Sequence, residues 1–219
     1  MAIEVNSDFI EINSDFAKGA EGWSPGFTDY SLELADLGLI AGIRPMPENL
    51  GVSSTSYYIQ GRNSSDDLFM FLTRRLTPQN SIQPNSHYQL EVEIQFASDA
   101  PSGAVGIGGA PGESVFVKAG ASSIQPTALI NAAGEVSINI DKGNQAQGGQ
   151  DAGVVGNVAN GRSPEEPVEY VLLTLTYRHP TPVITDTDGN LWLIVGTDSG
   201  FEGQTSLYYK QISVSLRER

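Results

Sequence analysis

The chain has 219 residues, and its 26 Asp and Glu against 12 Lys and Arg give a formal net charge of −14. A chain this acidic lacks the basic footprint that nucleic acids and anionic membranes require, so neither is an expected partner. It has no cysteine and only two histidines, which excludes disulfides, thiolate chemistry and cysteine-type zinc sites. No apolar run reaches the length of a transmembrane helix, and no membrane insertion is expected.

The first residues lack the charged and apolar regions of a secretory signal peptide. They instead contain a direct repeat, because residues 3–9 (IEVNSDF) are followed at once by residues 10–16 (IEINSDF). Either heptad presents the same strand face, so a shift of register between the two copies is an open alternative. We expect residues 1–12 to be a leader or spare strand and residues 13–219 to form a single domain.

Strict alternation of apolar and polar residues predicts several half-buried strands. The longest runs from Tyr88 to Phe96, with apolar residues at every second position. Shorter alternating segments occur at 136–140, 173–177 and 212–216, and more fully buried strands are expected at 68–72, 115–117 and 191–195. Residues 32–43 could form one short helix. Many short strands separated by turn residues indicate an all-β sandwich of the jelly-roll type.

One segment, residues 141–153, is polar and rich in glycine, with no apolar period. A long segment of this kind in a compact domain is either functional or a plain, even disordered, surface loop, and both interpretations stay open.

Three stretches resemble jelly-roll carbohydrate-binding modules with the galactose-binding-like sandwich. Residues 13–16 (NSDF) lead into Gly19, Gly22 and Trp23, residues 76–88 resemble the entry into a long alternating strand, and residues 207–214 resemble the last strand. The resemblance extends to uncharacterised bacterial extracytoplasmic proteins of this architecture. It implies a β-sandwich with an enlarged mid-chain insertion, because the chain is longer than such modules and the excess lies between 100 and 165.

The resemblance also implies a function and a location. The expected function is non-catalytic binding of a polysaccharide or cell-surface glycan, by a protein that is secreted, periplasmic or held at the cell surface; a cytoplasmic location stays open. The chain departs from the family at Lys210, where many such modules carry an aspartate that helps to hold calcium. A second departure is Ala17, where the family has a glutamate.

Sugar binding needs aromatic faces for stacking and planar polar groups for paired hydroxyls. Residues 57–67 combine both kinds, and Trp23 offers a further ring. In an alternating strand only one of Tyr57 and Tyr58 can face the core. Trp192, inside an apolar run, is expected in the core. The candidate ligand-binding residues are therefore Tyr57, Tyr58, Arg62, Asn63, Asp66, Asp67 and Trp23, each weighed against an ordinary core or surface role.

A calcium site is the one cofactor site that the sequence suggests. Asp186, Asp188 and Asn190 place oxygens at every second position, as an EF-hand loop begins. The glycine falls at the fourth position of the loop instead of the sixth, and no bidentate glutamate follows at the twelfth, so the same residues also fit a simple acidic turn before a strand.

Two other classes of function remain as alternatives. One is a structural or adhesion module that binds a protein partner, with or without calcium. The other is a glycoside hydrolase, which needs only a pair of carboxylates. Catalysis is the less favoured interpretation, because the chain has no nucleophile elbow and only His87 and His179 could act as a histidine base.

Overall fold

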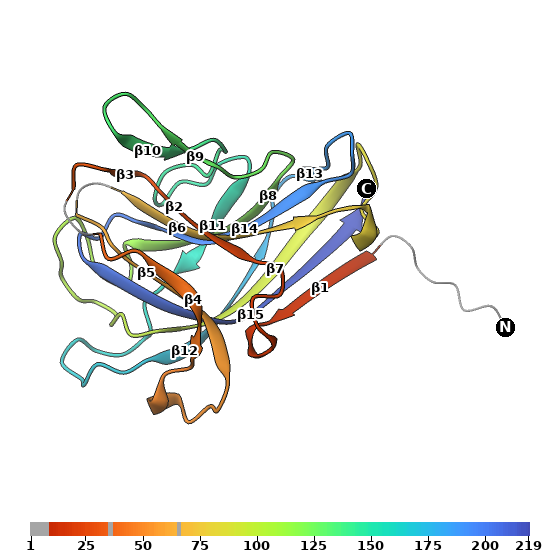
Figure 1. Cartoon of the computed structure of the whole chain (residues 1–219). Coiled ribbons are helices and arrows are strands. Elements are labelled where there is room, and N and C mark those ends of the chain that lie inside the picture. The colour runs from red at the N-terminus through yellow and green to blue at the C-terminus, as the bar shows by residue number, and fades with distance from the viewer. Residues whose placement is uncertain (1–8, 35–36, 65–66) are drawn as a thin grey trace.

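The computed structural model describes residues 9–34, 37–64 and 67–219, and it is built almost wholly from strands (Figure 1). The described strands are β1 (Phe9–Asp15), β2 (Ser24–Thr28), β3 (Tyr30–Ser31), β4 (Ile40–Pro45), β5 (Thr55–Arg62), β6 (Leu68–Leu76), β7 (His87–Ser98), β8 (Val115–Ser122), β9 (Ala128–Ile130), β10 (Glu135–Ile138), β11 (Ala152–Asn157), β12 (Val171–Arg178), β13 (Val183–Ile184), β14 (Leu191–Ser199) and β15 (Gln204–Glu218). Three 3₁₀ turns, η1 (Phe16–Lys18), η2 (Glu48–Leu50) and η3 (Pro78–Asn80), complete the described elements. Every strand predicted from alternation or apolar runs is present.

The strands form a two-layered sandwich. One layer is a seven-stranded sheet with the order β12-β7-β15-β5-β4, in which β1 also pairs with β15 and β13 with β7. The other layer is a five-stranded sheet with the order β11-β8-β14-β6-β2. The predicted fold class, a jelly-roll β-sandwich with an enlarged mid-chain insertion, is confirmed.

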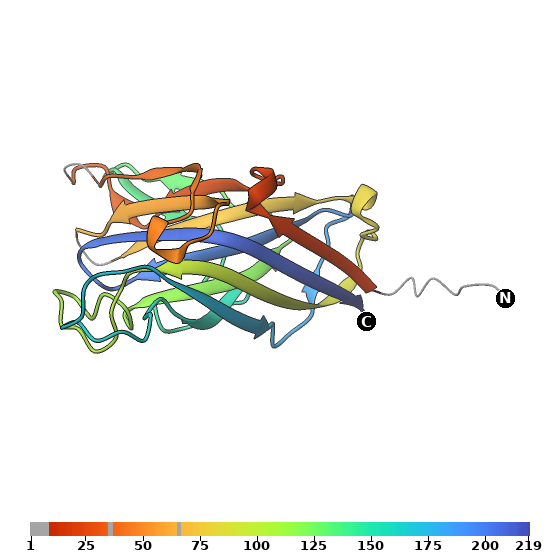
Figure 2. The ribbon, with the colours of Figure 1, turned by 90° about the horizontal axis from the view of Figure 1, so that it is seen from below.

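The 15-residue strand β15 is the central strand of the seven-stranded sheet. Its first half pairs with β5, its second half pairs with β1, and β7 runs along its other edge. In Figure 2 the outer side of this sheet faces the viewer, with β1, β15, β7 and β12 side by side. Because side chains alternate along each strand, the polar residues of these four strands share the outer face while their apolar residues enter the core.

The core lies between the two sheets. Leu90, Ile94 and Phe96 of β7 are fully buried, as are Ile212 and Leu216 of β15. Burial of one such large apolar side chain contributes about 1.5–3 kcal/mol, so these alternating positions fix which face of each strand points inward.

The mid-chain insertion covers the other side of the sandwich. Its strands β9 and β10 form a three-stranded sheet with β3, which comes from near the N-terminus, and this sheet lies over the outer face of the five-stranded sheet, as Figure 1 shows. Ile140 packs there with Phe69, Phe71 and Ile194 in a second small core. Residues 141–151, named the covering loop from here on, continue along the same face. The polar segment expected as a surface or binding loop is therefore an ordered cover that ends in β11.

Two expectations change. The domain begins earlier than residue 13, because β1 starts at Phe9 and Phe9 to Ile12 pair with β15; residues 1–8 lie outside the described part. The short helix considered for residues 32–43 does not form over its described positions, where β4 begins at Ile40. Among the described residues, no helix is long and apolar enough to span a membrane.

Candidate functional site

An open groove of about 440 Å³ lies on the outer face of the seven-stranded sheet. It crosses β1, β15, β7 and β12, the four strands that lie side by side in Figure 2. Its polar lining residues are Glu11, Asn13, Glu91, Glu93, Thr176, Arg178, Ser213 and Ser215, together with Tyr177.

Strand register explains why these residues gather. One row across the four strands joins Asn13, Ser213, Glu93 and Thr176, and the next row joins Glu11, Ser215, Glu91 and Arg178. Two positions along each strand separate the rows, so all eight side chains point outward. The small serines on the central strand β15 leave a trough between the longer side chains of the neighbouring strands.

The groove carries more acidic than basic groups. Arg178 is its basic side chain, and its Nε lies 3.6 Å from Glu91 Oε1. Both partners are more than half exposed, so this ion pair contributes little to stability and can exchange its bonds with a ligand. Glu11 and Glu93 supply two further carboxylates. The groove therefore offers hydroxyl, amide, carboxylate and guanidinium groups within reach of one bound molecule.

A cluster of tyrosines occupies the other end of the same face. The rings of Tyr58 and Tyr208 lie 4.6 Å apart, and Tyr170 meets Tyr208 edge-on at 5.0 Å. The guanidinium of Arg44 lies 4.4 Å from the centre of the Tyr58 ring. Arg44 and Tyr208 cover Tyr58 almost completely, which leaves Tyr170 and Tyr208 as the partly exposed rings.

Polar side chains connect the tyrosine cluster with the groove. Lys210 Nζ donates to Gln95 Oε1 at 2.8 Å, where a bulge between Tyr209 and Gln211 turns both Lys210 and Gln211 toward the surface. Tyr208 and Ser215 are seven positions apart on β15, which corresponds to about 23 Å at roughly 3.3 Å per residue. The outer face is thus a continuous strip with rings at one end and the groove at the other.

The structure separates the two tyrosines that the sequence proposed. Tyr58 points to the outer face, whereas Tyr57 points into the core and packs edge-on against Phe16 at 5.4 Å. Trp23 is also buried, and its Nε1 donates to Ser14 Oγ at 2.8 Å. Tyr57 and Trp23 are thus corrected to core residues. Tyr58 is corrected as well, because Arg44 and Tyr208 cover it and leave its ring no free face for a sugar. Trp192, which was expected in the core, is instead partly exposed, and the Arg75 guanidinium lies 5.5 Å from its ring centre.

The polar residues predicted beside Tyr58 have structural partners. Asn63 is buried and its amide donates to the Ser199 carbonyl at 2.8 Å, so its expected role as a ligand-binding group is corrected to an anchor. Asp67 accepts a hydrogen bond from Gln145 Nε2 at 2.9 Å, and burial raises the pKa of its carboxyl. Arg62 is exposed at the end of β5, and Asp66 lies outside the described residues.

The candidate calcium ligands form a hydrogen-bonded turn. Asp186 Oδ1 accepts from the backbone N–H groups of Asp188 and Asn190 at 2.9 and 2.7 Å, and its Oδ2 accepts from the Asn190 amide at 2.7 Å. This is the acidic turn that the sequence offered as the alternative. Within the described ranges, no group of three or more His, Asp or Glu side chains is arranged to hold a metal. The calcium site stays a prediction.

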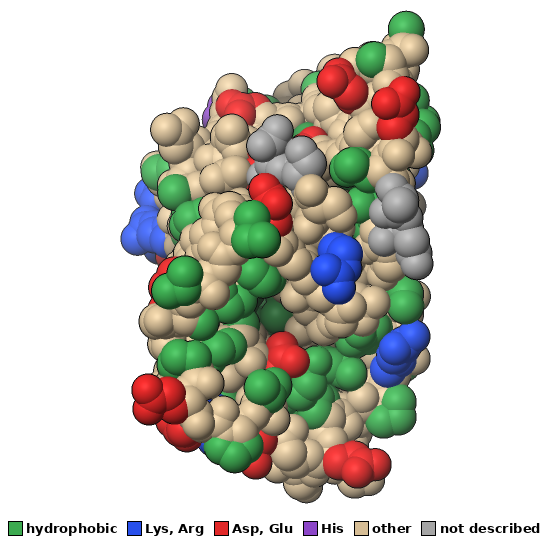
Figure 3. Space-filling model, turned by 90° about the vertical axis from the view of Figure 1, so that its left-hand side faces the viewer, with side chains coloured by type: hydrophobic (Ala, Val, Ile, Leu, Met, Phe, Trp, Pro, Cys, Tyr) green, Lys and Arg blue, Asp and Glu red, His purple; other side chains and the backbone are tan. Residues whose placement is uncertain are grey.

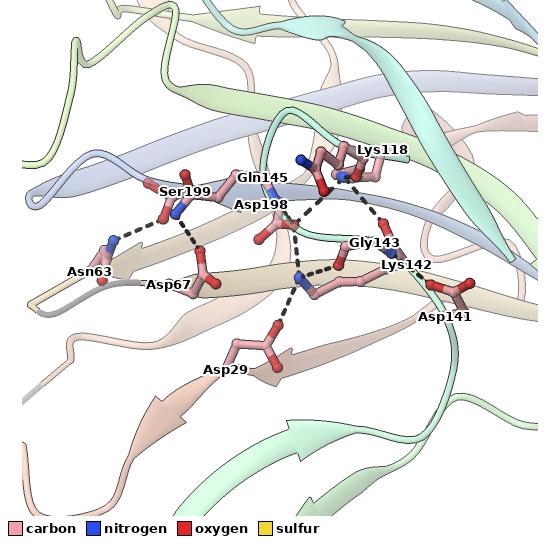
Figure 4. A network of polar contacts seen from close by, with 11 residues as sticks. Asp29, Asn63, Asp67, Lys118, Asp141, Lys142, Gly143, Gln145, Asp198 and Ser199 are labelled. Atoms are coloured by element: carbon pink, nitrogen blue, oxygen red, sulfur yellow. Dashed lines mark hydrogen bonds and ion pairs between the residues drawn. The ribbon is translucent and has the colours of Figure 1, made fainter. Parts of the chain in front are cut away.

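Sequence reasoning missed a buried charge network beneath the covering loop (Figure 4). Lys118 and Asp198 are fully buried on adjacent strands, with Lys118 Nζ 3.7 Å from Asp198 Oδ2. Lys142 joins the same oxygen at 2.7 Å and also contacts Asp29 at 2.9 Å. The signal was available: Lys118 interrupts an apolar strand, and Asp198 follows one after two residues.

This network ties the covering loop to the sheet. Lys118 Nζ donates to the carbonyls of Lys142 at 3.1 Å and Gln147 at 2.6 Å. The backbone N–H of Gln145 donates to Asp198 at 2.8 Å. Burial lowers the pKa of Lys118; burial also acts on Lys142, but the carboxylates of Asp198 and Asp29 outweigh it and raise the pKa of that lysine. These contacts make the network a structural anchor.

Several solved structures are similar to this sandwich. One is a structure from a study of the promiscuous specificity of β-sandwich carbohydrate-binding modules, with 12% sequence identity and a TM-score of 0.39. The match covers 90% of this chain and 58% of the chain in that structure. TmCBM61, in complex with β-1,4-galactotriose, has 10% sequence identity and a TM-score of 0.40, and the match covers 91% of this chain and 92% of TmCBM61. The C-terminal family 22 module of Clostridium thermocellum Xyn10B has 14% sequence identity and a TM-score of 0.42, and the match covers 94% of this chain and 92% of that module.

No protein-family model and no curated protein matches the chain. The structural neighbours include carbohydrate-binding modules of the β-sandwich type, the class of module that the sequence resembles. The identities and TM-scores are low, so they assign neither a ligand nor a site to this chain.

Proposed function

We propose that the protein is a non-catalytic carbohydrate-binding module, which binds a polysaccharide or cell-surface glycan along the outer face of the seven-stranded sheet. The observation that supports this most directly is the groove of about 440 Å³ lined by two registered rows of polar side chains. An extended glycan needs a trough that is open at both ends, and a row of strands with small central residues supplies that shape.

The chemistry of the face fits the same ligand class. Glu93, Asn13 and Arg178 provide planar polar groups that can bridge neighbouring hydroxyls, and the serines supply further donors and acceptors. The partly exposed rings of Tyr170 and Tyr208 offer apolar faces further along the strip. Binding without catalysis is supported by the exposure of Glu11, Glu91 and Glu93, because the general acid of a glycoside hydrolase is typically a carboxyl in a sheltered setting. A location outside the cell or at its surface belongs to this proposal.

The test is binding of the full chain to a panel of soluble neutral, acidic and amino-sugar polysaccharides, by affinity electrophoresis and then calorimetry. We expect saturable binding to at least one of them. Glu93→Gln should weaken it about tenfold, since one hydrogen bond to a charged group contributes about 1.5 kcal/mol. Ser213→Trp, which fills the trough, should abolish it. The matched control Glu165→Gln, on an exposed loop, should bind as the parent does.

Two further arms separate the alternatives. Chelator should leave binding intact if the groove alone is responsible, and a loss that calcium restores would point to the Asp186 turn. Release of reducing ends from any bound glycan would establish the hydrolase instead. If no glycan binds, or if Ser213→Trp binds as well as the parent, the groove is not a carbohydrate site.

A further inference from the structure

A second, smaller hollow lies at the end of the sandwich where β7 ends and β15 begins. It encloses about 200 Å³, less than half the volume of the groove. In Figure 3 this end faces the viewer, and hydrophobic side chains gather around a depression near its centre. The lining residues that matter here are Asp99, Pro101, Pro111, Val168, Phe201 and Leu207.

Backbone hydrogen bonds hold the loops that form its walls. The N–H of Glu202 donates to the carbonyl of Ile107 at 2.9 Å, and the N–H of Ser102 donates to the carbonyl of Arg162 at 2.8 Å. A side chain at Gly106 would lie 2.6 Å from the Phe201 ring, so this glycine allows the loop to pack directly on that ring. The hollow is therefore formed before any ligand arrives, which lowers the entropic cost of binding.

Exposed apolar side chains lie on the loops that form the walls of the hollow. Val168 is 76% exposed at its rim, and Val105 and Ile107, on the loop that packs against Phe201 and Glu202, are 98% and 72% exposed. Single exposed apolar residues are ordinary, but a group around a preformed hollow is typical of a surface that binds another protein.

The hollow also contains a carboxylate without a cationic partner among the described residues. Asp99 is partly buried and accepts a hydrogen bond from the Tyr170 hydroxyl. The nearby Arg162 is engaged elsewhere, with Glu166 and Glu169 each at 3.1 Å. Burial raises the pKa of the Asp99 carboxyl.

We propose that this hollow binds one arginine or lysine side chain presented by a partner protein. The aliphatic stem would lie along Pro101, Val168 and Phe201, and the cationic head would meet Asp99. Long basic side chains combine an apolar stem and a charged end in this way. The net charge of −14 would steer a basic partner surface toward the molecule. The lining also includes Ser98, Gln204, Thr205 and Ser206, so a glycan is the competing ligand that the experiment must distinguish.

The probe is an acetylated, amidated Leu-Arg-Leu tripeptide, with a citrulline peptide of the same shape but no charge as its counterpart. Both are titrated into the ¹⁵N-labelled full chain. We expect saturable shifts of the Ala100, Val168 and Phe201 amide signals with the arginine peptide, and binding at least fivefold weaker with citrulline. Asp99→Asn should remove that difference, while the exposed control Glu33→Gln should keep it.

A second variant guards against loss of fold. Val168→Arg sits at an exposed position and supplies the cation itself, so it should leave the rest of the spectrum unchanged and abolish peptide binding. Equal binding of the two peptides, or shifts confined to other surfaces, would overturn the proposal. So would shifts at these residues with glycan oligomers and none with peptides, because the hollow would then belong to the carbohydrate-binding face. Failure of the groove to bind glycans leaves this proposal untouched.

Discussion

Replacing Asp198 by Asn tests whether the buried charge network stabilises the insertion. The Asp198 carboxylate has no exposed side-chain surface, and a single oxygen serves Lys142 at 2.7 Å, the N–H of Gln145 at 2.8 Å and Lys118 at 3.7 Å. The Asn side chain has nearly the same shape but no charge. Two ammonium groups would then lose a shared counterion, although Lys142 keeps Asp29.

Removing one partner of a buried ion pair costs about 3–5 kcal/mol. Folded domains are stable by about 5–15 kcal/mol, so this loss is a large fraction of the total. For a chain of this length it corresponds to a fall in Tm of roughly 6–20 °C, at about 2–4 °C per kcal/mol.

Urea unfolding followed by tryptophan fluorescence and circular dichroism measures the difference. Asp188→Asn, on an exposed turn, is the matched control and should change the free energy of unfolding by less than about 0.5 kcal/mol. If Asp198→Asn costs less than about 1 kcal/mol, the carboxylate is not the counterion of two buried lysines and the covering loop is held by its other contacts.

Three smaller predictions concern single side chains. Tyr209→Phe should leave stability unchanged or raise it by up to about 1 kcal/mol in urea unfolding, because the buried Tyr209 hydroxyl has no hydrogen-bond partner among the described residues; a clear loss would reveal one. Backbone N–H groups of Gln150 and Gly143 lower the pKa of Asp141 below its ordinary 3.8. The ionised carboxylate therefore stabilises the fold fully above its ordinary pKa, and this contribution is lost as the pH falls through the lowered pKa. The difference in stability between the parent and Asp141→Asn, measured by thermal unfolding, should narrow from pH 7 to pH 3 and vanish in acid. A difference that stays constant with pH would contradict this. Gly120→Ala should cost about 1–3 kcal/mol, because a methyl group there would overlap the backbone of the covering loop; an unchanged denaturation midpoint would show that the loop yields easily.

The sandwich could be predicted because alternation is a local property. The alternation from Tyr88 to Phe96 indicates a half-buried strand without knowledge of its partners, and the observed strand β7 includes this whole segment. Sequence alone did not show which strands share an edge, because pairing joins residues far apart in the chain, such as Glu11 with Ser215. The groove depends on that register, so none of its residues could be nominated from local patterns.

The nominated aromatics show the same limit. Alternation shows that Tyr57 and Tyr58 face opposite sides, but only the direction of β5 within the sheet decides which side is the core. Trp23 follows a turn and Trp192 lies in an apolar run, yet the first is buried and the second is partly exposed. Because the insertion covers the outer face of one sheet, some outer positions of that sheet are apolar. An apolar run in the sequence therefore indicates either the core or a covered outer face.

The asymmetry between the two outer faces connects stability with binding. The insertion covers the outer face of the five-stranded sheet and seals the Lys118–Asp198 pair, whereas the outer face of the seven-stranded sheet keeps its polar rows open. The core separates the two regions, and substitutions that share no partners across such a distance act additively. Asp198→Asn should therefore lower the free energy of unfolding without changing glycan affinity at temperatures where the variant is folded. Glu93→Gln should do the reverse, and a variant that changed both properties would show that the insertion also shapes the groove.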